Sequence, residues 1–115
     1  MIDDCTFCRI VSGKIPAQRV YEDETVLAIR DINPQAPVHL LMLPKKHLAS
    51  VQDASKQDAP LIGALTLAAV QLARTEGLDH RGFRLVINVG PEGGQTVPHL
   101  HMHLLGGRQM KWPPG

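Results

Sequence analysis

The sequence of 115 residues is long enough for one domain and too short for two hydrophobic cores of useful size. The 12 Lys and Arg residues exceed the 11 Asp and Glu residues by one, and this net charge of +1 is too small to hold a long nucleic acid by its backbone. The first residues, MIDDCTFCRI, lack the regions of a secretion signal, and no stretch is apolar enough to cross a bilayer, so we expect one cytoplasmic domain without membrane contacts.

The first half of the chain predicts one short helical segment followed by three strands. The stretch TFCRIVSGKIP, residues 6–16, begins as a short helical or irregular segment, which its glycine and proline end. Residues 20–22 and 25–31 flank the polar turn EDE, which predicts two neighbouring strands. A third strand is expected over residues 38–43, VHLLML, and a proline closes it.

The second half predicts one long helix and two further strands. Between residues 58 and 76 the apolar side chains follow the helical period and form one stripe: Leu61, Leu65, Ala68, Ala69 and Leu72. Asp58 is expected to be the N-cap of this helix and Gly77 its C′ residue. Strands are expected at residues 82–90 and 97–107, on either side of the loop PEGGQTVP. These elements together predict an α+β domain with a mainly antiparallel sheet of five strands.

Three of the six histidines alternate with apolar residues in the stretch VPHLHMHLLGG. A period of two is the strand period, so His99, His101 and His103 would share one face while Leu100 and Met102 face the core. The outer two histidines would lie about 13 Å apart along a strand, too far to bind one metal ion together easily. Three imidazoles on one face predict a cleft, because imidazole can act as nucleophile, general acid or hydrogen-bond donor to phosphate.

The loop before the histidines has the composition of an anion site. Its two adjacent glycines permit positive φ angles and a close approach of backbone N–H groups to an anion. Gln95 and Thr96 add side-chain donors at the same place. A glycine pair alone is most often a turn, but here it leads directly into three histidines, which favours a phosphate cradle.

HLHMHLL matches the HφHφHφφ signature of the histidine triad superfamily. The blocks DINPQAPVHLLMLPKKH, GGQTVPHLHMHLLGGRQM and WPPG resemble its Hint branch of nucleoside phosphoramidases, and the similarity runs from FCRIVSGKIPA to the last residue. This resemblance implies a single HIT domain over residues 1–115, with residues 108–115 as a C-terminal tail. It also implies a short N-terminal helix and a sheet that continues across a homodimer.

The resemblance implies the enzyme activity of a nucleoside phosphoramidase, a hydrolase acting on P–N bonds. His101 would attack the α-phosphorus of a purine nucleoside 5′-phosphoramidate, such as an adenosine phosphoramidate or an AMP-lysine-like adduct. The amine would leave, and water would hydrolyse the nucleotidyl-histidine to release the nucleoside monophosphate. His103 would donate to the phosphate or the leaving group, and His99 with His39 would orient the nucleophile. This route requires no cofactor.

The same resemblance implies how the AMP or GMP moiety is held. Four residues would hold phosphate oxygens: Asn88, Gly94, Gln95 and Thr96. Asp31 would accept hydrogen bonds from the ribose, although an Asp before Asn-Pro also commonly caps a turn. Four apolar side chains would sandwich the base, although the isoleucines among them also suit a plain core: Phe7, Ile10, Ile29 and Ile32. Trp112 in the tail would complete the substrate site.

The CxxC pair near the N-terminus raises a separate prediction. Some members of the superfamily bind structural zinc through such a pair, the histidine after PK and the first triad histidine. Here these ligands would be Cys5, Cys8, His47 and His99, a suitable tetrahedral set. The alternative is a pair of small buried residues or free thiols. A zinc ligand at position 99 would also compete with a contact between His99 and His39.

Two other functions remain open at this point. In the first, His101 and His103 join His39 around a catalytic zinc, which would make turnover sensitive to chelators. In the second, the cleft binds a nucleotide or supports partner binding with little turnover. Chelator sensitivity separates the first from the phosphoramidase, and an assay with a phosphoramidate separates the second.

Overall fold

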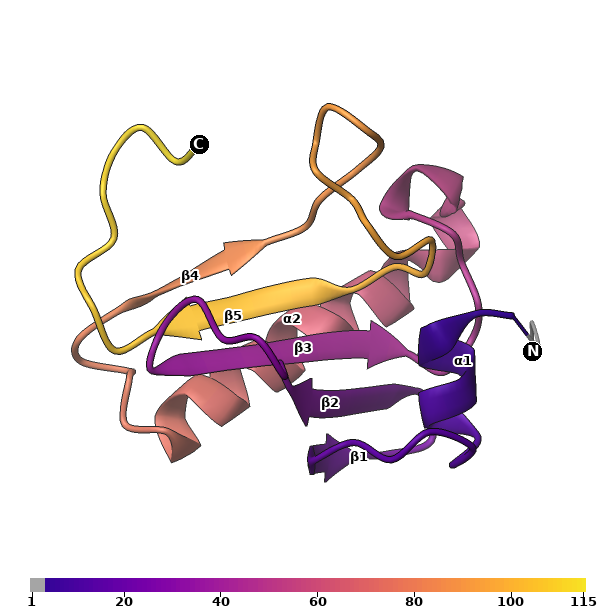
Figure 1. The fold of residues 1–115 in the computed structure, drawn as a ribbon, viewed down its shortest axis with the longest axis horizontal. Helices are drawn as coiled ribbons and strands as arrows, with labels where there is room; N and C mark the ends of the chain where they lie inside the picture. The colour runs from indigo at the N-terminus through magenta and orange to yellow at the C-terminus, as the bar shows by residue number, and fades with distance from the viewer. Residues whose placement is uncertain (1–3) are drawn as a thin grey trace.

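The structure is a computed structural model and describes residues 4–115. Its helices and strands are α1 (Thr6–Val11), β1 (Arg19–Glu22), β2 (Val26–Arg30), β3 (Val38–Pro44), α2 (Ala59–Thr75), β4 (Phe83–Val86) and β5 (Met102–Gly106). The strands form one antiparallel sheet in the order β1-β2-β3-β5-β4, which confirms the predicted α+β class with five strands and one long helix (Figure 1). Within residues 4–115, no helix combines the length and apolar character that a membrane span requires.

The two faces of the sheet pack against different helices (Figure 1). On one face α2 covers a core that includes Ala28, Leu40, Met42, Leu72 and Leu104. On the other face α1 covers a second core that includes Phe7, Ile10, Leu27, Ile29 and Leu41. The division follows from the strand period, because successive side chains of β2 and β3 point to opposite faces. The short N-terminal helix therefore helps to form the face on which a site can be built.

Both ends of α2 lie where the sequence predicts them, but the side chain of the N-cap residue has another partner. Gly77 has φ +77°, and the amides of Gly77 and Leu78 donate to the carbonyls of Arg74 and Ala73, a Schellman ending. Asp58 occupies the N-cap position, but its side chain makes no capping bond to α2. Its carboxylate instead accepts from Ser55 N–H, because it caps the 3₁₀ turn over Lys56–Asp58 that precedes the helix.

Both strands of the second half are shorter than predicted. The predicted strand 82–90 pairs with β5 only over Phe83–Val86, and the chain then turns into the glycine loop. The predicted strand 97–107 pairs only over Met102–Gly106, because Leu100 N–H already donates to Leu48 O outside the sheet. The alternation of side chains nevertheless continues ahead of the strand, since Leu100 lies in the α2 core and His99 contacts Phe7 of α1.

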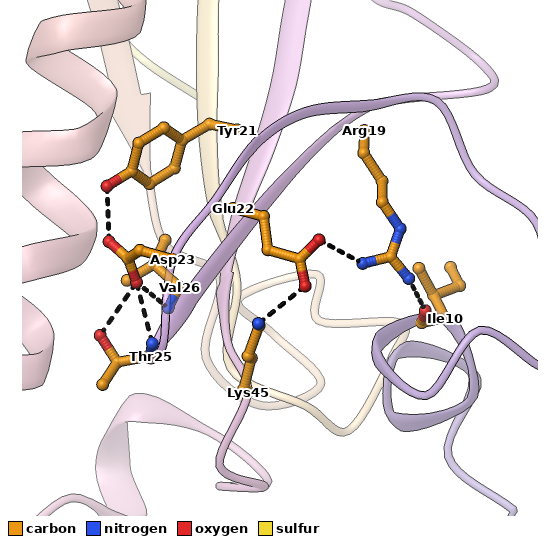
Figure 2. A network of polar contacts seen from close by, with 8 residues as sticks. All are labelled: Ile10, Arg19, Tyr21, Glu22, Asp23, Thr25, Val26 and Lys45. Atoms are coloured by element: carbon orange, nitrogen blue, oxygen red, sulfur yellow. Dashed lines mark hydrogen bonds and ion pairs between the residues drawn. The ribbon is translucent and has the colours of Figure 1, made fainter.

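A polar network fixes α1 to the edge of the sheet (Figure 2). The guanidinium of Arg19 donates to Glu22 and to the carbonyl of Ile10 near the end of α1, and Lys45 pairs with Glu22 at 2.7 Å. Beside it, Asp23 closes the predicted EDE turn, and hydrogen bonds from Tyr21 and two backbone amides lower its pKa to about 2. The network thereby holds the end of α1, where Ile10 lines a cleft between this helix and the sheet.

Candidate active site and metal centre

A cleft of about 360 Å³ lies between α1 and the sheet. Eight of the residues proposed from sequence line it: Phe7, Ile10, Ile29, Asp31, Ile32, Thr96, His101 and His103. Ile10 and Ile29 are almost completely buried, so they belong to the core and also form the wall of the cleft. Ile32 is 98% exposed, which places it at the mouth. The cleft thus combines an apolar wall with two imidazoles, a carboxylate and a hydroxyl.

A backbone hydrogen bond defines the tautomer of His101. Its Nδ1 lies 2.7 Å from the backbone carbonyl of His99, and a carbonyl oxygen can only accept a hydrogen bond. In the neutral form of the ring the proton is therefore on Nδ1, and Nε2 carries a lone pair. The edge of the Phe7 ring packs against the imidazole with a centroid distance of 5.0 Å, which limits how the ring can turn. The lone pair on Nε2 of His101 is therefore free to bond to an electrophile or to accept a proton.

A second chain of hydrogen bonds fixes His39 and His103. The amide N–H of Gln35 donates to Nδ1 of His39 at 3.0 Å, so the proton of His39 is on Nε2. That Nε2 lies 2.8 Å from Nδ1 of His103 and donates to it, which leaves His103 with a proton on its own Nε2. Burial, reinforced by His101 and His39, lowers the pKa of His103 to about 4. Burial also lowers the pKa of His39, so both rings are neutral at neutral pH.

The two oxygens of Asp31 have different partners. Oδ1 accepts from Asn33 N–H at 2.8 Å and caps the turn, as the alternative interpretation of this residue expects. Oδ2 lies 3.4 Å from Nε2 of His39. Because Asp31 also lines the cleft, the turn and the cleft both use this carboxylate.

The glycine loop is held by two side chains that were predicted to bind phosphate. The Gln95 amide accepts from Gly90 N–H and donates to the carbonyls of Ala49 and Val97. Asn88 donates to Gly93 O at 2.7 Å. At Gly93 a Cβ atom would lie 2.1 Å from Val89 O, so only glycine fits. Thr96 lines the cleft. Asn88 and Gln95 are not among its lining residues, and their hydrogen bonds instead stabilise the loop that leads to it.

Four side chains predicted as zinc ligands come together beside the cleft; we call Cys5, Cys8, His47 and His99 the four-ligand cluster. Nε2 of His99 donates to Pro44 O at 2.9 Å, so its Nδ1 has a free lone pair. That Nδ1 lies 3.2 Å from Nδ1 of His47 and 3.3 Å and 3.6 Å from the sulfurs of Cys5 and Cys8. Burial lowers the pKa of His99 and raises the pKa of the Cys5 thiol.

The spacing of the four-ligand cluster fits a tetrahedral zinc ion. With ordinary Zn–N and Zn–S bond lengths, ligand atoms of such a site lie about 3.3 Å apart for two nitrogens and about 3.6 Å apart for nitrogen and sulfur. The observed separations of 3.2 to 3.6 Å match these values. Two thiols and two imidazoles are also the ligand types that zinc prefers.

The structure separates two histidines that the family resemblance pairs. The ring of His99 joins the four-ligand cluster, and its backbone carbonyl contacts His101. His39 contacts His103 instead of His99. A catalytic zinc on His39 is also unfavourable, because the Gln35 amide fixes a proton on the nitrogen that would have to bind the metal. The sequence did not reveal the role of the Gln35 amide, because backbone donors carry no residue signature.

The remaining lining residues include some that the strand period could have found. Leu41 lies two positions from His39 on β3, and Val97 lies two positions from His99.

A larger hollow of about 410 Å³ beside the start of α2 is a weaker candidate site. Two of its charged groups, Lys46 and Asp58, form an ion pair with each other at 2.8 Å.

An antiparallel sheet in which alternating histidines face a cleft is the arrangement of a histidine triad domain. The HIT domain model matches residues 12–110, and the chain belongs to this family. The structure superimposes with a TM-score of 0.96 on a HIT family hydrolase from Legionella pneumophila that is 54% identical, with 97% of this chain and 100% of that chain covered. This similarity supports a hydrolase kind of enzyme.

Two further relatives concern zinc. The 14 kDa zinc-binding protein of Brassica juncea is 51% identical over 114 residues, which are 97% of this chain and 100% of that protein. A Zn-bound histidine triad family protein from Mycobacterium smegmatis is 39% identical, with a TM-score of 0.79 and coverage of 91% of this chain and 76% of that chain.

Proposed function

We propose that the protein is a nucleoside phosphoramidase of the Hint branch, which hydrolyses the P–N bond of purine nucleoside 5′-phosphoramidates. The observation that carries the proposal is the hydrogen bond from His101 Nδ1–H to the carbonyl of His99. It leaves the Nε2 lone pair as the nucleophile of a neutral ring in a cleft that also contains a carboxylate and a hydroxyl.

In the first step Nε2 of His101 forms a bond to the α-phosphorus, and the bond from phosphorus to nitrogen breaks. The nitrogen takes up one proton from solvent and leaves as an amine; the water consumed in the second step returns one proton to solvent. Nε2–H of His103 donates a hydrogen bond to the phosphate or the leaving nitrogen, where charge develops. Water then attacks the nucleotidyl-histidine, so one water is consumed and the nucleoside monophosphate is released.

The nucleotide is proposed to lie along the cleft. Oδ2 of Asp31 accepts from the ribose hydroxyls, and the apolar wall of Phe7, Ile10, Ile29 and Ile32 packs against the base. Thr96 donates to phosphate oxygens at the end of the glycine loop. In this arrangement Asn88, Gly94 and Gln95 contribute through the shape of the loop, which their hydrogen bonds and the φ of +78° at Gly94 support.

We also propose that the four-ligand cluster binds a structural zinc ion. The ligand separations and the zinc-binding relatives support this assignment. The zinc would stabilise the fold around α1, and the proposed reaction needs no metal of its own.

A homodimer is proposed to complete the site, with residues 1–115 as one domain and residues 108–115 as its tail. Strand β4 lies at an edge of the sheet, and an edge strand can pair with a second copy. Arg84 on β4 donates to Lys111 O at 2.8 Å and so anchors the tail there. Trp112 is 84% exposed, which suits a side chain that reaches the cleft of the partner.

The experiment that tests the activity is mass measurement of the intact chain after brief exposure to an adenosine phosphoramidate. An AMP adduct that is absent in His101→Gly is expected. The control is His80→Gly, since the side chain of His80 is 98% exposed. Near-normal turnover in His101→Gly would refute the assignment. AMP binding without an adduct in the unmodified protein would favour the nucleotide-binding alternative.

A further inference from the structure

The backbone and the side chain of His99 serve two different sites. Its ring contributes Nδ1 to the four-ligand cluster, while its carbonyl accepts the proton of His101 Nδ1 at 2.7 Å. The ring is completely buried, and Pro44 O holds its other nitrogen at 2.9 Å. One residue therefore links the cluster to the proposed nucleophile through a few covalent bonds.

The segment around His99 lies outside the sheet, so contacts other than strand pairing position its carbonyl. Strand β5 begins only at Met102, so both His99 and His101 precede the ladder with β3. The described backbone bonds near His99 run to Val97 and, from Leu100, to Leu48. The bond from Leu100 N–H fixes the peptide plane that also contains the His99 carbonyl. The ring of His99 holds the Cα side of this peptide through its contacts with the four-ligand cluster, with Pro44 and with Phe7.

The same cluster anchors the other neighbour of His101. Cys5 is the N-cap of α1, where its sulfur accepts from Cys8 N–H, and Phe7 lies between the two cysteines. The Phe7 ring packs edge-on against His99 and His101, with centroid distances of 5.8 Å and 5.0 Å. The carbonyl that orients the nucleophile and the ring that packs against it are both attached to residues of the cluster.

We infer that His99 is a positioning residue, and that metal binding by the four-ligand cluster fixes the orientation of the His101 imidazole. The inference rests on the proposed function, because it assigns the cluster a role in nucleotidyl transfer to His101. Loss of the metal is expected to slow formation of the adduct by roughly 10- to 100-fold, the usual effect of losing a group that orients a reacting ligand. Nucleotide affinity should change by less than about threefold, because the network at Arg19 also holds α1.

The test compares protein purified with zinc, the same protein after removal of zinc with a chelator, and the stripped protein after zinc is added back. The first measurement is hydrogen exchange of the imidazole Nδ1–H of His101, followed by NMR in protein with ¹⁵N-labelled histidine. The second is the single-turnover rate of adduct formation, and the third is the Kd for AMP. Stripping should speed the exchange at least about tenfold and slow the adduct, and zinc should reverse both effects.

Variants separate positioning from general loss of stability. His47→Gln removes a ligand that is neither in α1 nor next to His101 and should reproduce the stripped protein, whereas His47→Cys keeps four ligands and should restore the zinc-loaded behaviour. Leu65→Ala, in the α2 core, should lower the melting temperature without changing the exchange of the His101 proton. Because exchange is measured without substrate, a protein that forms no adduct still tests the inference. Unchanged exchange on stripping, or failure of the protein to bind zinc, would overturn it.

Discussion

The imidazole of His39 donates its Nε2 proton to Nδ1 of His103 across 2.8 Å. The direction of this bond follows from the Gln35 amide, which can only donate to the other nitrogen of His39. Both rings must therefore stay neutral for the pair to persist, because a protonated His103 would present a second donor to His39.

Acid should destabilise the protein through this pair. The folded-state pKa of His103 is about 4, compared with 6.5 for an ordinary histidine, so between these values the unfolded chain binds the proton more readily. The free energy of unfolding should fall as the pH drops from about 7 to about 4, with a contribution from His103 of up to about 3 kcal/mol. His103→Gln should flatten this dependence in denaturant titrations, and the exposed His80→Gln should not. Equal slopes for unmodified protein and His103→Gln would contradict the pKa assignment.

Two glycines should respond oppositely to replacement by alanine. Gly93→Ala places a Cβ atom 2.1 Å from Val89 O and should destabilise the protein and loosen the loop before Thr96. Gly63 lies inside α2, where an added Cβ atom would meet nothing within 4 Å, so Gly63→Ala should stabilise the helix by about 0.5–1 kcal/mol. Chemical denaturation of both variants measures the difference. A Gly93→Ala variant as stable as Gly63→Ala would show that the loop can relax.

Asp31 should select ribose over deoxyribose. If its Oδ2 accepts from the ribose hydroxyls, an adenosine phosphoramidate should be hydrolysed with a higher kcat/KM than its 2′-deoxy analogue. Asp31→Asn keeps an oxygen for the bond from Asn33 N–H and should reduce this preference by roughly 1–3 kcal/mol of transition-state discrimination. Ile32→Val at the mouth of the cleft provides the comparison, since it should leave the sugar preference intact. An equal preference in Asp31→Asn would remove the carboxylate from the ribose site.

Protein purified without chelator should contain a single zinc ion per chain that survives desalting. Cys8→Ser should lose it, because that sulfur lies 3.3 Å from Nδ1 of His47 and 3.6 Å from Nδ1 of His99. Elemental analysis together with thiol titration checks the prediction. Metal-free protein with both thiols reduced and reactive would favour the interpretation of Cys5 and Cys8 as plain buried residues.

The tail should matter for selectivity more than for stability. Removing residues 111–115 takes away Trp112 and the carbonyl that Arg84 contacts, yet it removes nothing from either core. Relative kcat/KM for phosphoramidates with different amines should shift, while the melting temperature changes little, and sizing should give a dimer. A monomer at micromolar concentration, or unchanged selectivity after truncation, would argue against a tail that reaches the partner.

Periodicity predicted the parts of the fold that depend on side-chain alternation, and it predicted the common face of the histidines even where the chain leaves the sheet. It overestimated the length of the last two strands. Backbone bonds such as that from Leu100 N–H to Leu48 O end a strand, and the pattern of side chains does not reveal them. It placed Asp58 correctly at the N-cap of α2, but it could not show that the carboxylate accepts from Ser55 N–H and not from the helix. The hydrogen bonds that set the tautomers of His39 and His101 come from backbone groups, so only the structure reveals them.

Strand β2 is buried on both faces over Val26 to Ile29, and its neighbouring side chains enter different cores. Ala28 belongs to the core under α2, whereas Leu27 and Ile29 belong to the core under α1, next to the cleft. Substitutions one position apart should therefore act on separate properties. Replacing Ala28 would alter the robustness of the scaffold, and replacing Ile29 would reshape the pocket, so directed evolution could adjust durability and substrate range from a single short segment.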